Sequence, residues 1–522
     1  MNFKDLFFPI AFAFLTTWAI HHFFLGSPSV VSDSTLVRSG QSFNVAPTKG
    51  EIESKPLNLE VDFIDTISTA TPVITHMQTD HEQLLFSTEG ASLENLTFKR
   101  TIDGKFIAIT TIHRPNSTER EQRAFLVGFN QLTPYEYEFV DEKKEADLVA
   151  ITYKATTEQA IVTKTFVIDK NSYKIDLALT IEPRGLGITD GVQARIFLPA
   201  PYMPELRLNN IIRGLSNNEQ NTVEKIKPTA IENKAWGLPT LFGAENRYFI
   251  HALVADHGKF ARRAYYKIEG VAPDRITAII EGPTVKEKTT WNLSFYCGPK
   301  EAESMVAVDP RLEETLDYGW FALISKFLLY ILKYLYSYVH NYGWAIIILT
   351  LIAKIILVPF TLKSQKSIQQ QVELEKKRKY IEQKYKHDSE ALNREKVALM
   401  TKQGGFSSMG GMIIPILVQV PLFIGLNKVL SNSIELYQAP FMGWITDLSV
   451  KDPYYIIPLL VGIGGMLQIS TTSDARQKLV SFLGALIFIG ITANLSAGLA
   501  LFFCVDRWAS FVQMKIQQAL KI

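Results

Sequence analysis

The chain contains an apolar run long enough to cross a membrane, and this run carries a charge near its middle. Residues 344–362 spell WAIIILTLIAKIILVPFTL, in which Lys354 is the only ionisable side chain. As an α-helix, a run of this length spans the roughly 30 Å hydrocarbon core of a bilayer. A lysine at such a depth costs about 2.5–3.5 kcal/mol on insertion scales, so its presence needs a structural or functional reason.

A second run of this kind lies at the N-terminus. Residues 7–24 are apolar and follow Lys4, and the small residues Ala11 and Ala13 lie too far inside the run for a good signal-peptide cleavage site. This favours a retained membrane anchor over residues 1–25 rather than a cleaved signal peptide. Residues 26–56 are rich in Ser, Thr, Gly and Pro and predict a flexible linker.

Four further apolar segments predict four more spans, which makes six in total. A content of 47% hydrophobic residues in 522, with a mean hydropathy of +0.07, is high for a soluble protein and agrees with this count. An aromatic segment before the second span carries Lys326 and Lys333 on one helical face, which is typical of an amphipathic helix in the membrane interface. The predicted ranges are 316–340 for the interface helix and 341–362, 407–432, 454–470, 479–494 and 498–518 for the second to sixth spans.

The segment 363–405 is polar and favours helix, and it predicts a cytoplasmic helical hairpin. Residues 363–403 hold eleven Lys and Arg residues against six Asp and Glu residues. The positive-inside rule places this hairpin in the cytoplasm, and both chain termini with it, while the loop 433–453 falls outside. The candidate cations of the hairpin are Lys376, Lys377, Arg378, Lys379, Lys384 and Arg394.

Residues 57–312 have a different pattern, in which apolar and polar residues alternate in short runs. AIVTKTFVID and YKIDLALTIEP are two examples, and Gly, Pro and Asn separate such runs. Period-two alternation of β-branched and aromatic residues predicts a large all-β sandwich. Cys297 falls in this region and Cys504 in an apolar helix, so the sequence supports neither a disulfide framework nor a metal site.

Polar residues recur inside the predicted spans, and two explanations of Lys354 stay open. Its ammonium group can reach the cytoplasmic headgroups by snorkelling, although the tilt of helical side chains toward the N-terminus disfavours this. Alternatively, Lys354 faces a hydrated groove within the bundle, where intramembrane ionisable residues usually lie. The other candidate groove residues are Thr350, Thr361, Gln419, Asn427, Asp506, Arg507 and Trp508.

The sequence predicts no enzyme, and no cofactor or metal. Patterns such as GxSxG, HExxH, a Walker loop or GxGxxG at a strand-to-helix turn are missing from it. The spans offer neither paired aspartates nor a Ser/His pair for intramembrane proteolysis.

Three strings show a family resemblance. They are Val308–Trp344, Ile434–Leu460 and the short motif SAGLALFF at Ser496–Phe503, together with the spacing of Pro415, Gln419 and Pro421. With these motifs, the chain resembles the YidC/Oxa/Alb family of membrane protein insertases, in the Gram-negative form with a large periplasmic domain. The resemblance covers nearly the whole chain and is weakest over residues 26–290.

The resemblance implies a bacterial inner-membrane protein that inserts nascent membrane proteins and helps them fold. It implies a five-helix insertase core with a hydrated, positively charged groove, and a β-supersandwich domain in the periplasm. Family members usually carry arginine where this chain has Lys354; Arg507 is one candidate replacement for that guanidinium, and Asp506 is a candidate partner of Lys354. Expected partners are the bilayer and ribosome or Sec-type translocon components, without sequence-specific nucleic-acid binding. The residues expected to guide a client helix into lipid are Phe423, Leu426, Phe482 and Ile489.

Two other functions compete with insertion. A solute transporter would use Lys354 as the counter-ion of its substrate, but the sequence shows no inverted repeats. A receptor would bind glycans through its external β domain, and the polar residues of the spans would then be incidental.

Overall fold

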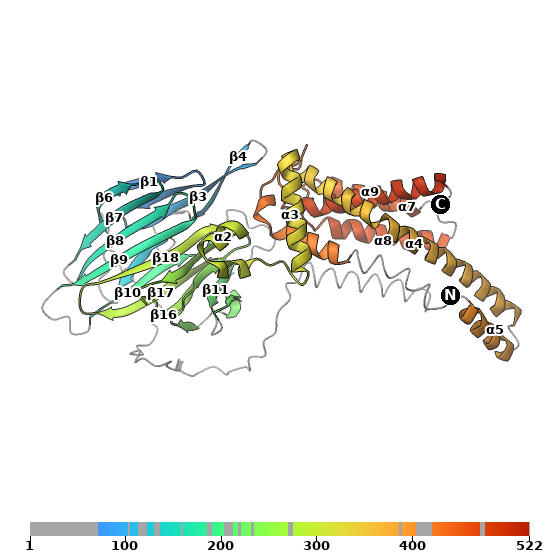
Figure 1. Ribbon diagram of the computed structural model, residues 1–522, viewed down its shortest axis with the longest axis horizontal. Coiled ribbons are helices and arrows are strands. Elements are labelled where there is room, and N and C mark those ends of the chain that lie inside the picture. Colours follow the sequence, from blue (N-terminus) through green and yellow to red (C-terminus); the bar gives the residue numbers. More distant parts are fainter. Residues whose placement is uncertain are drawn as a thin grey trace. The chain divides into compact units, whose positions relative to one another are not determined.

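The computed structural model describes two compact units of the chain, which meet in sequence at Leu316 and Asp317 and are treated separately here (Figure 1). The predicted anchor 1–25, the linker 26–56 and Gln419 lie outside the described residues. The described ranges are 71–102, 105–112, 123–129, 136–157, 160–184, 191–202, 212–217, 221–230, 234–269, 275–385, 389–402, 420–469 and 475–520.

The first unit is built from antiparallel sheets, the largest of which has nine strands in the order β12-β11-β14-β15-β18-β9-β8-β7-β6. Its central strands are long, and its two edges are short or strongly polar. The strands are β6 (Glu138–Lys144), β7 (Leu148–Thr156), β8 (Ala160–Asp169), β9 (Lys174–Pro183), β11 (Arg213–Asn217), β12 (Val223–Ile226), β14 (Phe242–Glu245), β15 (Phe249–Asp256) and β18 (Thr289–Pro299).

Two smaller antiparallel sheets complete this unit. One has the order β1-β2-β3-β4 and the other the order β13-β16-β17-β10-β5. The strands of the first are β1 (Ile74–Gln78), β2 (Glu82–Ser87), β3 (Ser92–Ile102) and β4 (Lys105–Ile112). Those of the second are β5 (Leu126–Phe129), β10 (Val192–Pro199), β13 (Ala235–Gly237), β16 (Arg263–Glu269) and β17 (Arg275–Val285).

The alternating sequence pattern buries one face of the nine-stranded sheet. Buried and half-buried residues alternate along all ten positions of β8. The strand register then aligns buried residues from five strands in one row across the sheet. This row consists of Phe242, Leu253, Phe295, Ile175 and Ile168, none of which is more than 1% exposed.

Both smaller sheets pack on this buried face. The ring of Phe86 from β2 lies 4.8 Å from that of Phe166 on β8, and Tyr266 from β16 stacks on Phe242 of β14 at 4.5 Å. The Tyr266 hydroxyl donates to the carbonyl oxygen of Leu215 on β11. The prediction of a β sandwich is therefore confirmed for the described residues between 71 and 299, whereas the last part of the predicted range, 57–312, holds the helix α2 (Ala302–Val308).

A buried lysine links two of the sheets. Lys164 on β8 is fully buried, and its Nζ donates to the carbonyl oxygens of Gly90, Ala91 and Phe125 at 2.6, 3.2 and 2.8 Å. The ring of Tyr137 lies 4.9 Å from the same nitrogen. Burial lowers the pKa of Lys164 well below its usual range.

Two other ionisable groups are buried in this unit. His251 accepts or donates at both ring nitrogens, to the Pro199 carbonyl oxygen at 2.9 Å and to the Thr111 hydroxyl at 3.2 Å. Burial lowers the pKa of His251 to about 4, so the ring is neutral at physiological pH. Burial also raises the pKa of Glu82 to about 8.

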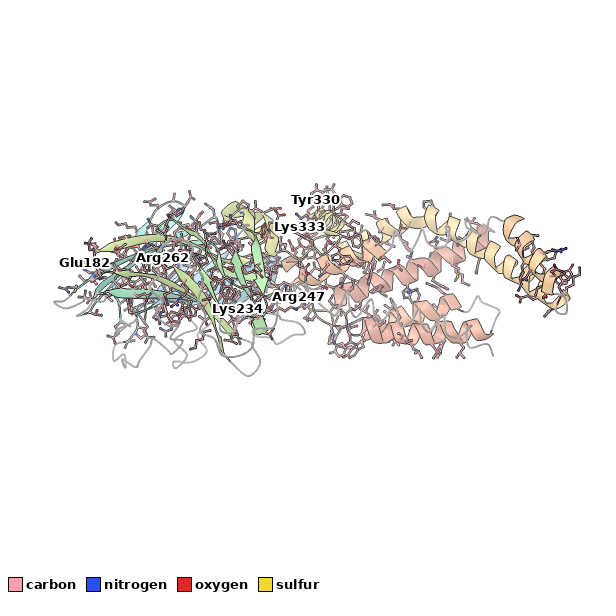
Figure 2. The ribbon with its side chains drawn as sticks, turned by 90° about the horizontal axis from the view of Figure 1, so that it is seen from below. Glu182, Lys234, Arg247, Arg262, Tyr330 and Lys333 are labelled. Carbon is pink, nitrogen blue, oxygen red and sulfur yellow. The ribbon has the colours of Figure 1, made fainter. Side chains whose placement is uncertain are left out.

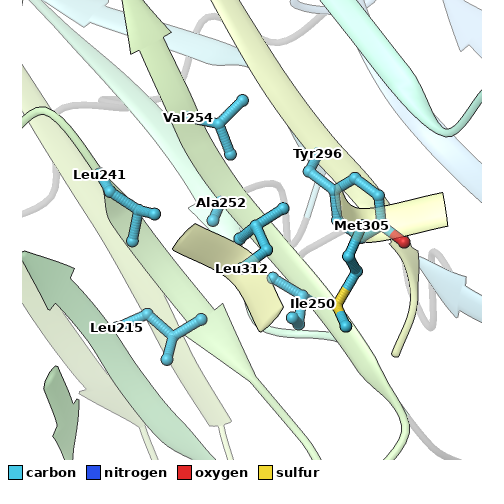
Figure 3. Close-up of a cluster of buried hydrophobic side chains, with 8 residues drawn as sticks. All are labelled: Leu215, Leu241, Ile250, Ala252, Val254, Tyr296, Met305 and Leu312. Carbon is cyan, nitrogen blue, oxygen red and sulfur yellow. The ribbon is translucent and has the colours of Figure 1, made fainter. Parts of the chain in front are cut away.

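A hydrophobic cluster closes the β unit where the chain leaves the last strand. The helix α2 (Ala302–Val308) and the 3₁₀ turn η4 (Pro310–Thr315) pack their buried residues against β11, β15 and β18, as Figure 3 shows. The Asp309 carboxylate caps the turn by accepting from the backbone N–H of Arg311. The cluster is formed by Leu215, Leu241, Ile250, Ala252, Val254, Tyr296, Met305 and Leu312.

The second unit is helical. Its long helix α4 runs without interruption through the predicted end of the second span at Leu362, and through Pro359. A further helix covers residues 420–432. The other helices are α3 (Ala322–Val339), α4 (Tyr342–Lys384), α5 (Ser389–Lys402), α7 (Ile456–Ile469), α8 (Ala475–Thr492) and α9 (Ala497–Leu520).

Within the described residues, two helical segments are long and apolar enough to cross a membrane, Ala322–Val339 and Tyr342–Pro359. Shorter apolar helices cover Ile456–Gln468 and Phe482–Thr492. The count of six spans therefore stays a prediction. The first of the two long segments is α3, which the sequence analysis assigns to the membrane interface rather than to a span.

The helix α3 buries one side and exposes an aromatic stripe on the other. Its buried residues Ser325 and Leu328 lie beside Gly425 of the 420–432 helix. Lys333 pairs with Glu435 at 2.8 Å, while Tyr330 is 69% exposed; Figure 2 labels both side chains of α3. The exposed stripe continues through Trp320, Leu323, Phe327, Tyr334 and Tyr338. Aromatic residues of this kind are enriched where proteins meet the membrane interface.

Candidate functional site

The structure gives the lysine of the apolar run a partner. The Lys354 Nζ on α4 donates to the Asp506 Oδ1 on α9 at 2.7 Å. The two side chains are 14% and 15% exposed, so water screens the pair only weakly. The Lys354 side chain therefore points from α4 toward α9.

A hollow of about 700 Å³ lies beside this pair, between α4 and α9. Among the described residues that line it, Lys354 alone is charged, and Trp508, Gln513 and Gln517 add neutral polar groups. The remaining wall is apolar and consists of Leu351, Ile355, Val358, Leu362, Cys504, Val505, Ala509, Val512, Ile516 and Leu520. The hollow thus combines apolar walls with one amine, as ligand-accepting cavities commonly do.

Arg507 does not line the hollow and faces α8, whereas Trp508 lines the hollow and also reaches α7. The Arg507 guanidinium carbon lies 4.8 Å from the ring centroid of Phe488 on α8. The Trp508 Nε1 donates to the Leu460 carbonyl oxygen of α7 at 3.2 Å. Gly464 of α7 permits this approach, because a Cβ there would lie 3.3 Å from the Arg507 Cβ. Arg507 therefore does not lie beside Lys354.

The remaining candidate groove residues are held within their own helices or lie outside the described side chains. Thr350 is buried, and its hydroxyl donates to the Ile346 carbonyl oxygen one turn earlier. Asn427 is 6% exposed, and its Oδ1 accepts from the Ser431 hydroxyl. The Thr361 side chain is among those not described. Neither Thr350 nor Asn427 lines the hollow at Lys354.

The four residues expected to guide a client helix differ in exposure. Phe482 on α8 is 42% exposed, whereas Leu426 is 2% exposed. Ile489 packs against Gly462 of α7, where a Cβ would lie within 2.2 Å of its Cδ1. Phe423 lies 4.8 Å from the ring of Phe503 on α9. Phe482 is therefore exposed, whereas Phe423, Leu426 and Ile489 pack against other parts of the helical unit.

The loop 433–453 folds tightly over one end of the helices, which the sequence analysis did not foresee. Asp452 accepts from the Trp444 Nε1 at 3.0 Å and, through its other oxygen, from the backbone N–H of Ile457 at the start of α7. Asn341, the N-cap of α4, donates to the Phe441 carbonyl oxygen. The backbone N–H of Gly498 in α9 donates to the Leu448 carbonyl oxygen. The loop thus joins the starts of three helices.

Two family models match consecutive parts of the chain. The model of the YidC periplasmic domain matches residues 74–331, and that of the 60Kd inner membrane protein matches residues 334–521. The membrane protein insertase YidC of Geobacter metallireducens is 32% identical over 84% of both chains. The chain belongs to the YidC family of membrane protein insertases.

The chain is similar to further proteins of this name. The YidC insertase of Campylobacter jejuni is 30% identical over 81% of this chain and 82% of its own. A solved structure of an active YidC insertase with its first transmembrane domain resolved is 17% identical, covers 86% of this chain and 93% of its own, and has a TM-score of 0.36. The matched family is one of inner membrane proteins, and its members are named insertases rather than enzymes.

The family resemblance leads us to expect an arginine at position 354. Lysine binds a carboxylate in a simpler way than arginine does. Arginine binds a carboxylate through two parallel N–H groups, whereas the Lys354 ammonium is a point donor to one oxygen of Asp506. The sequence signal for this pair is the presence of one acid, Asp506, in the last apolar segment. Which of two neighbours, Asp506 or Arg507, faces α4 depends on helix rotation.

The polar segment after the second apolar run continues α4 by more than five turns. It ends at Lys384, and α5 begins at Ser389. Lys396 of α5 pairs with Glu382 of α4 at 2.8 Å, so the two helices lie side by side. Of the candidate cations, Lys377, Lys384 and Arg394 are exposed, and the side chains of Lys376, Arg378 and Lys379 lie outside the described set.

Proposed function

We propose that this YidC-family chain inserts integral membrane proteins, alone or with a Sec-type translocon, through a hydrated groove between its helices. The observation that carries the proposal is the ion pair of Lys354 and Asp506 beside a hollow of about 700 Å³. An ion pair among apolar helices is costly, and such groups in membranes usually mark a path for polar material.

The proposed mechanism is physical and needs no covalent step. The external tail of a client must cross an apolar layer in which each polar group is expensive. A hollow that water enters part of the way reduces the thickness of that layer. The apolar walls contributed by α4 and α9 would hold the client's hydrophobic residues while its tail crosses.

The exposed apolar face of α8 is the proposed exit toward lipid. Phe482 is 42% exposed there, and Leu483, Leu486 and Ile487 are each at least 45% exposed. A client helix leaving along this face would exchange protein contacts for lipid contacts of similar polarity. Phe423, Leu426 and Ile489 would support this surface from within.

The proposed topology follows from charge and from the loop over the helix ends. The cationic α4–α5 hairpin would lie in the cytoplasm and receive ribosome-bound or released chains, with both termini on the same side. The β unit would then lie in the periplasm. The tightly folded loop 433–453 would close the groove on that outer side, which supports an opening toward the cytoplasm and the lipid.

Insertion into liposomes tests the proposal directly. The purified full-length protein is reconstituted, and a small single-span client with a short acidic outer tail is added. Protease protection of the tail is expected only when the protein is present. Absence of protection with a folded sample would overturn the proposal, and transport of small solutes by the same vesicles would favour the transporter.

Thiol labelling tests whether the hollow is hydrated. Cys504 lines the hollow, whereas Cys297 is fully buried in the β unit. A charged, membrane-impermeant methanethiosulfonate reagent should therefore modify Cys504 and leave Cys297 unmodified, as read by mass spectrometry. A Cys504→Ser variant is the control. If Cys504 resists the reagent on both sides of the membrane, the hollow is dry and the groove mechanism fails.

A further inference from the structure

We infer that the loop 433–453 and the start of α7 form a membrane anchor of their own, which enters the headgroup layer and holds the helical unit at a fixed depth. The partner of this surface is lipid, at the boundary between headgroups and acyl chains. The proposed function gives the loop only the role of closing the groove, and it supplies the leaflet in question, the outer one.

Large side chains lie exposed at this end of the helical unit although the loop is tightly folded. Met442 is 57% exposed and Trp444 36%, and Tyr454 and Tyr455, directly before α7, are 68% and 54% exposed. These four side chains are called the exposed rim below. Gly443 at the tip has φ 60°, and a Cβ there would meet no atom of the described residues within 4 Å. Tryptophan and tyrosine are enriched where proteins meet the membrane–water interface.

A buried carboxylate holds the exposed rim in place. Asp452 is 2% exposed, and one of its oxygens accepts from the Trp444 Nε1 and from the backbone N–H of Tyr454, both at 3.0 Å. Its other oxygen accepts from the backbone N–H of Ile457 at 2.7 Å, in the first turn of α7. Tyr455 has φ 57°, a conformation that is costly for a bulky residue. The fold therefore fixes these rings at the surface.

The turn is also fixed to the start of α4. Phe441 packs on Gly343, where a Cβ would clash with its ring, and the ring of Trp344 lies 5.8 Å from that of Phe441. The Asn341 amide donates to the Phe441 carbonyl oxygen at 3.2 Å. Because the loop reaches the starts of both α4 and α7, the exposed rim and Trp344 lie at the same end of the helical unit.

Exposed apolar stripes begin at this level on both helices. On α4, Trp344 is 48% exposed and is followed on the same face by Leu351 and Ile355, which are 41% and 70% exposed. On α7, Tyr455 is followed one turn later by Leu459, which is 54% exposed. Contiguous apolar surface of this kind suits lipid and is unfavourable in water. The exposed rim therefore lies where the lipid-facing surface ends.

An anchor at this level sets the depth of the hollow between α4 and α9. Lys354 follows Trp344 by ten residues, which is about 15 Å along a helix and thus half of the hydrocarbon thickness. A rim held among the headgroups therefore keeps the pair of Lys354 and Asp506 near the middle of the bilayer.

Nitroxide depth measurements test the inference on the full-length protein in vesicles of phosphatidylethanolamine and phosphatidylglycerol. Met442→Cys is made in a Cys504→Ser background and spin-labelled, and Cys297 stays unlabelled because it is fully buried. Lys154→Cys, on the exposed face of β7, is the water reference, and Leu459→Cys is the lipid reference. The ratio of collisions with oxygen to collisions with a water-soluble nickel chelate should place the label at position 442 between the two references. A ratio equal to that of the water reference would overturn the inference.

Charged substitutions test whether the exposed rim sets the depth. Met442→Glu combined with Tyr454→Glu places two charges in the interface and should raise the nickel accessibility of the label on Leu459→Cys at least threefold. Tyr454→Trp keeps an interfacial ring and should leave that accessibility unchanged. Thr446→Glu is the matched control, because Thr446 is an exposed polar residue of the same loop outside the exposed rim. An unchanged accessibility in the double variant, or an equal rise in the control, would show that the rim does not hold the depth.

The depth measurements need no client, so they are independent of insertion. If the label at position 442 lies in the interface but the reconstituted protein inserts no client, the proposed function fails and the anchor stands. If clients are inserted while that label stays in water, only the anchor fails.

Discussion

Replacing Lys164 by methionine tests whether one buried amine holds the sheets of the β unit together. Methionine keeps the length and apolar body of the side chain but cannot donate to the carbonyl oxygens of Gly90, Ala91 and Phe125. Each buried acceptor left without a partner costs about 1–3 kcal/mol. The variant no longer has to desolvate an amine, which offsets part of this sum. We expect a net loss of about 3 kcal/mol in the free energy of unfolding.

Two of these three carbonyl groups belong to residues with strained backbones. Ala91 has φ 40° and Phe125 has φ 66°, a left-handed conformation that bulky residues rarely adopt. The lysine contact helps to hold both in place, because the same Nζ binds the carbonyl oxygens of both residues. Loss of that contact should therefore loosen the segments around Ala91 and Phe125 before the rest of the unit.

The pH dependence of the same variant has a definite sign. Burial lowers the pKa of Lys164 in the folded state, so between that pKa and 10.5 the unfolded chain binds a proton that the folded chain does not. The wild type therefore gains stability as pH rises through this window. Methionine removes that titration, so the stability difference between wild type and Lys164→Met should be larger at pH 9 than at pH 7.

The assay uses the full-length protein in detergent. Urea unfolding of the β unit is followed by hydrogen exchange and mass spectrometry of peptides from β7, β8 and β9. Lys154→Met is the matched control, because Lys154 is an exposed lysine on the neighbouring strand and should change stability by less than about 0.5 kcal/mol. Equal stability of the two variants would refute the reasoning.

Two further outcomes follow from buried or close-packed positions. Glu82→Gln should stabilise the β unit at pH 8. Burial raises the pKa of Glu82 to about 8, so the free energy of unfolding of the wild type falls by about 2 kcal/mol between pH 6.5 and 8. Glutamine does not titrate, so the urea assay should show no such fall for the variant. Gly462→Leu should lower the thermal midpoint and insertion, because its side chain would meet Ile489; Gly484→Leu, with nothing within 4 Å, should leave both unchanged.

The β unit was the part most accessible to sequence reasoning, and the reason is local. In β8 and β9, apolar and polar residues alternate with the period of a strand, and the structure buries the apolar set of each. The strand order was not accessible. It depends on pairings between distant residues, such as β15 with β18 and β10 with β17, which no local pattern encodes.

The helical unit shows a different limit. Apolar runs locate helices well, since α7 and α8 begin and end within four residues of the ranges expected. Composition cannot find the end of α4, because the chain changes from apolar to polar residues while the backbone continues as one helix to Lys384. Polar residues such as Lys and Glu favour helix as strongly as apolar ones do. The sequence thus shows where the chain changes from apolar to polar residues. It does not show that one helix continues through that point.

The charges of α9 show why the sequence could predict the candidate groove residues but not which of them are in contact. Asp506 and Arg507 are neighbours, and one residue along a helix is a rotation of about 100°. The structure turns Asp506 toward Lys354 and Arg507 toward Phe488 on α8. A rotation of α9 by one residue would exchange these partners and bring two cations together. The packing of α9 against α4 and α7 therefore decides which of the two neighbouring charges pairs with Lys354.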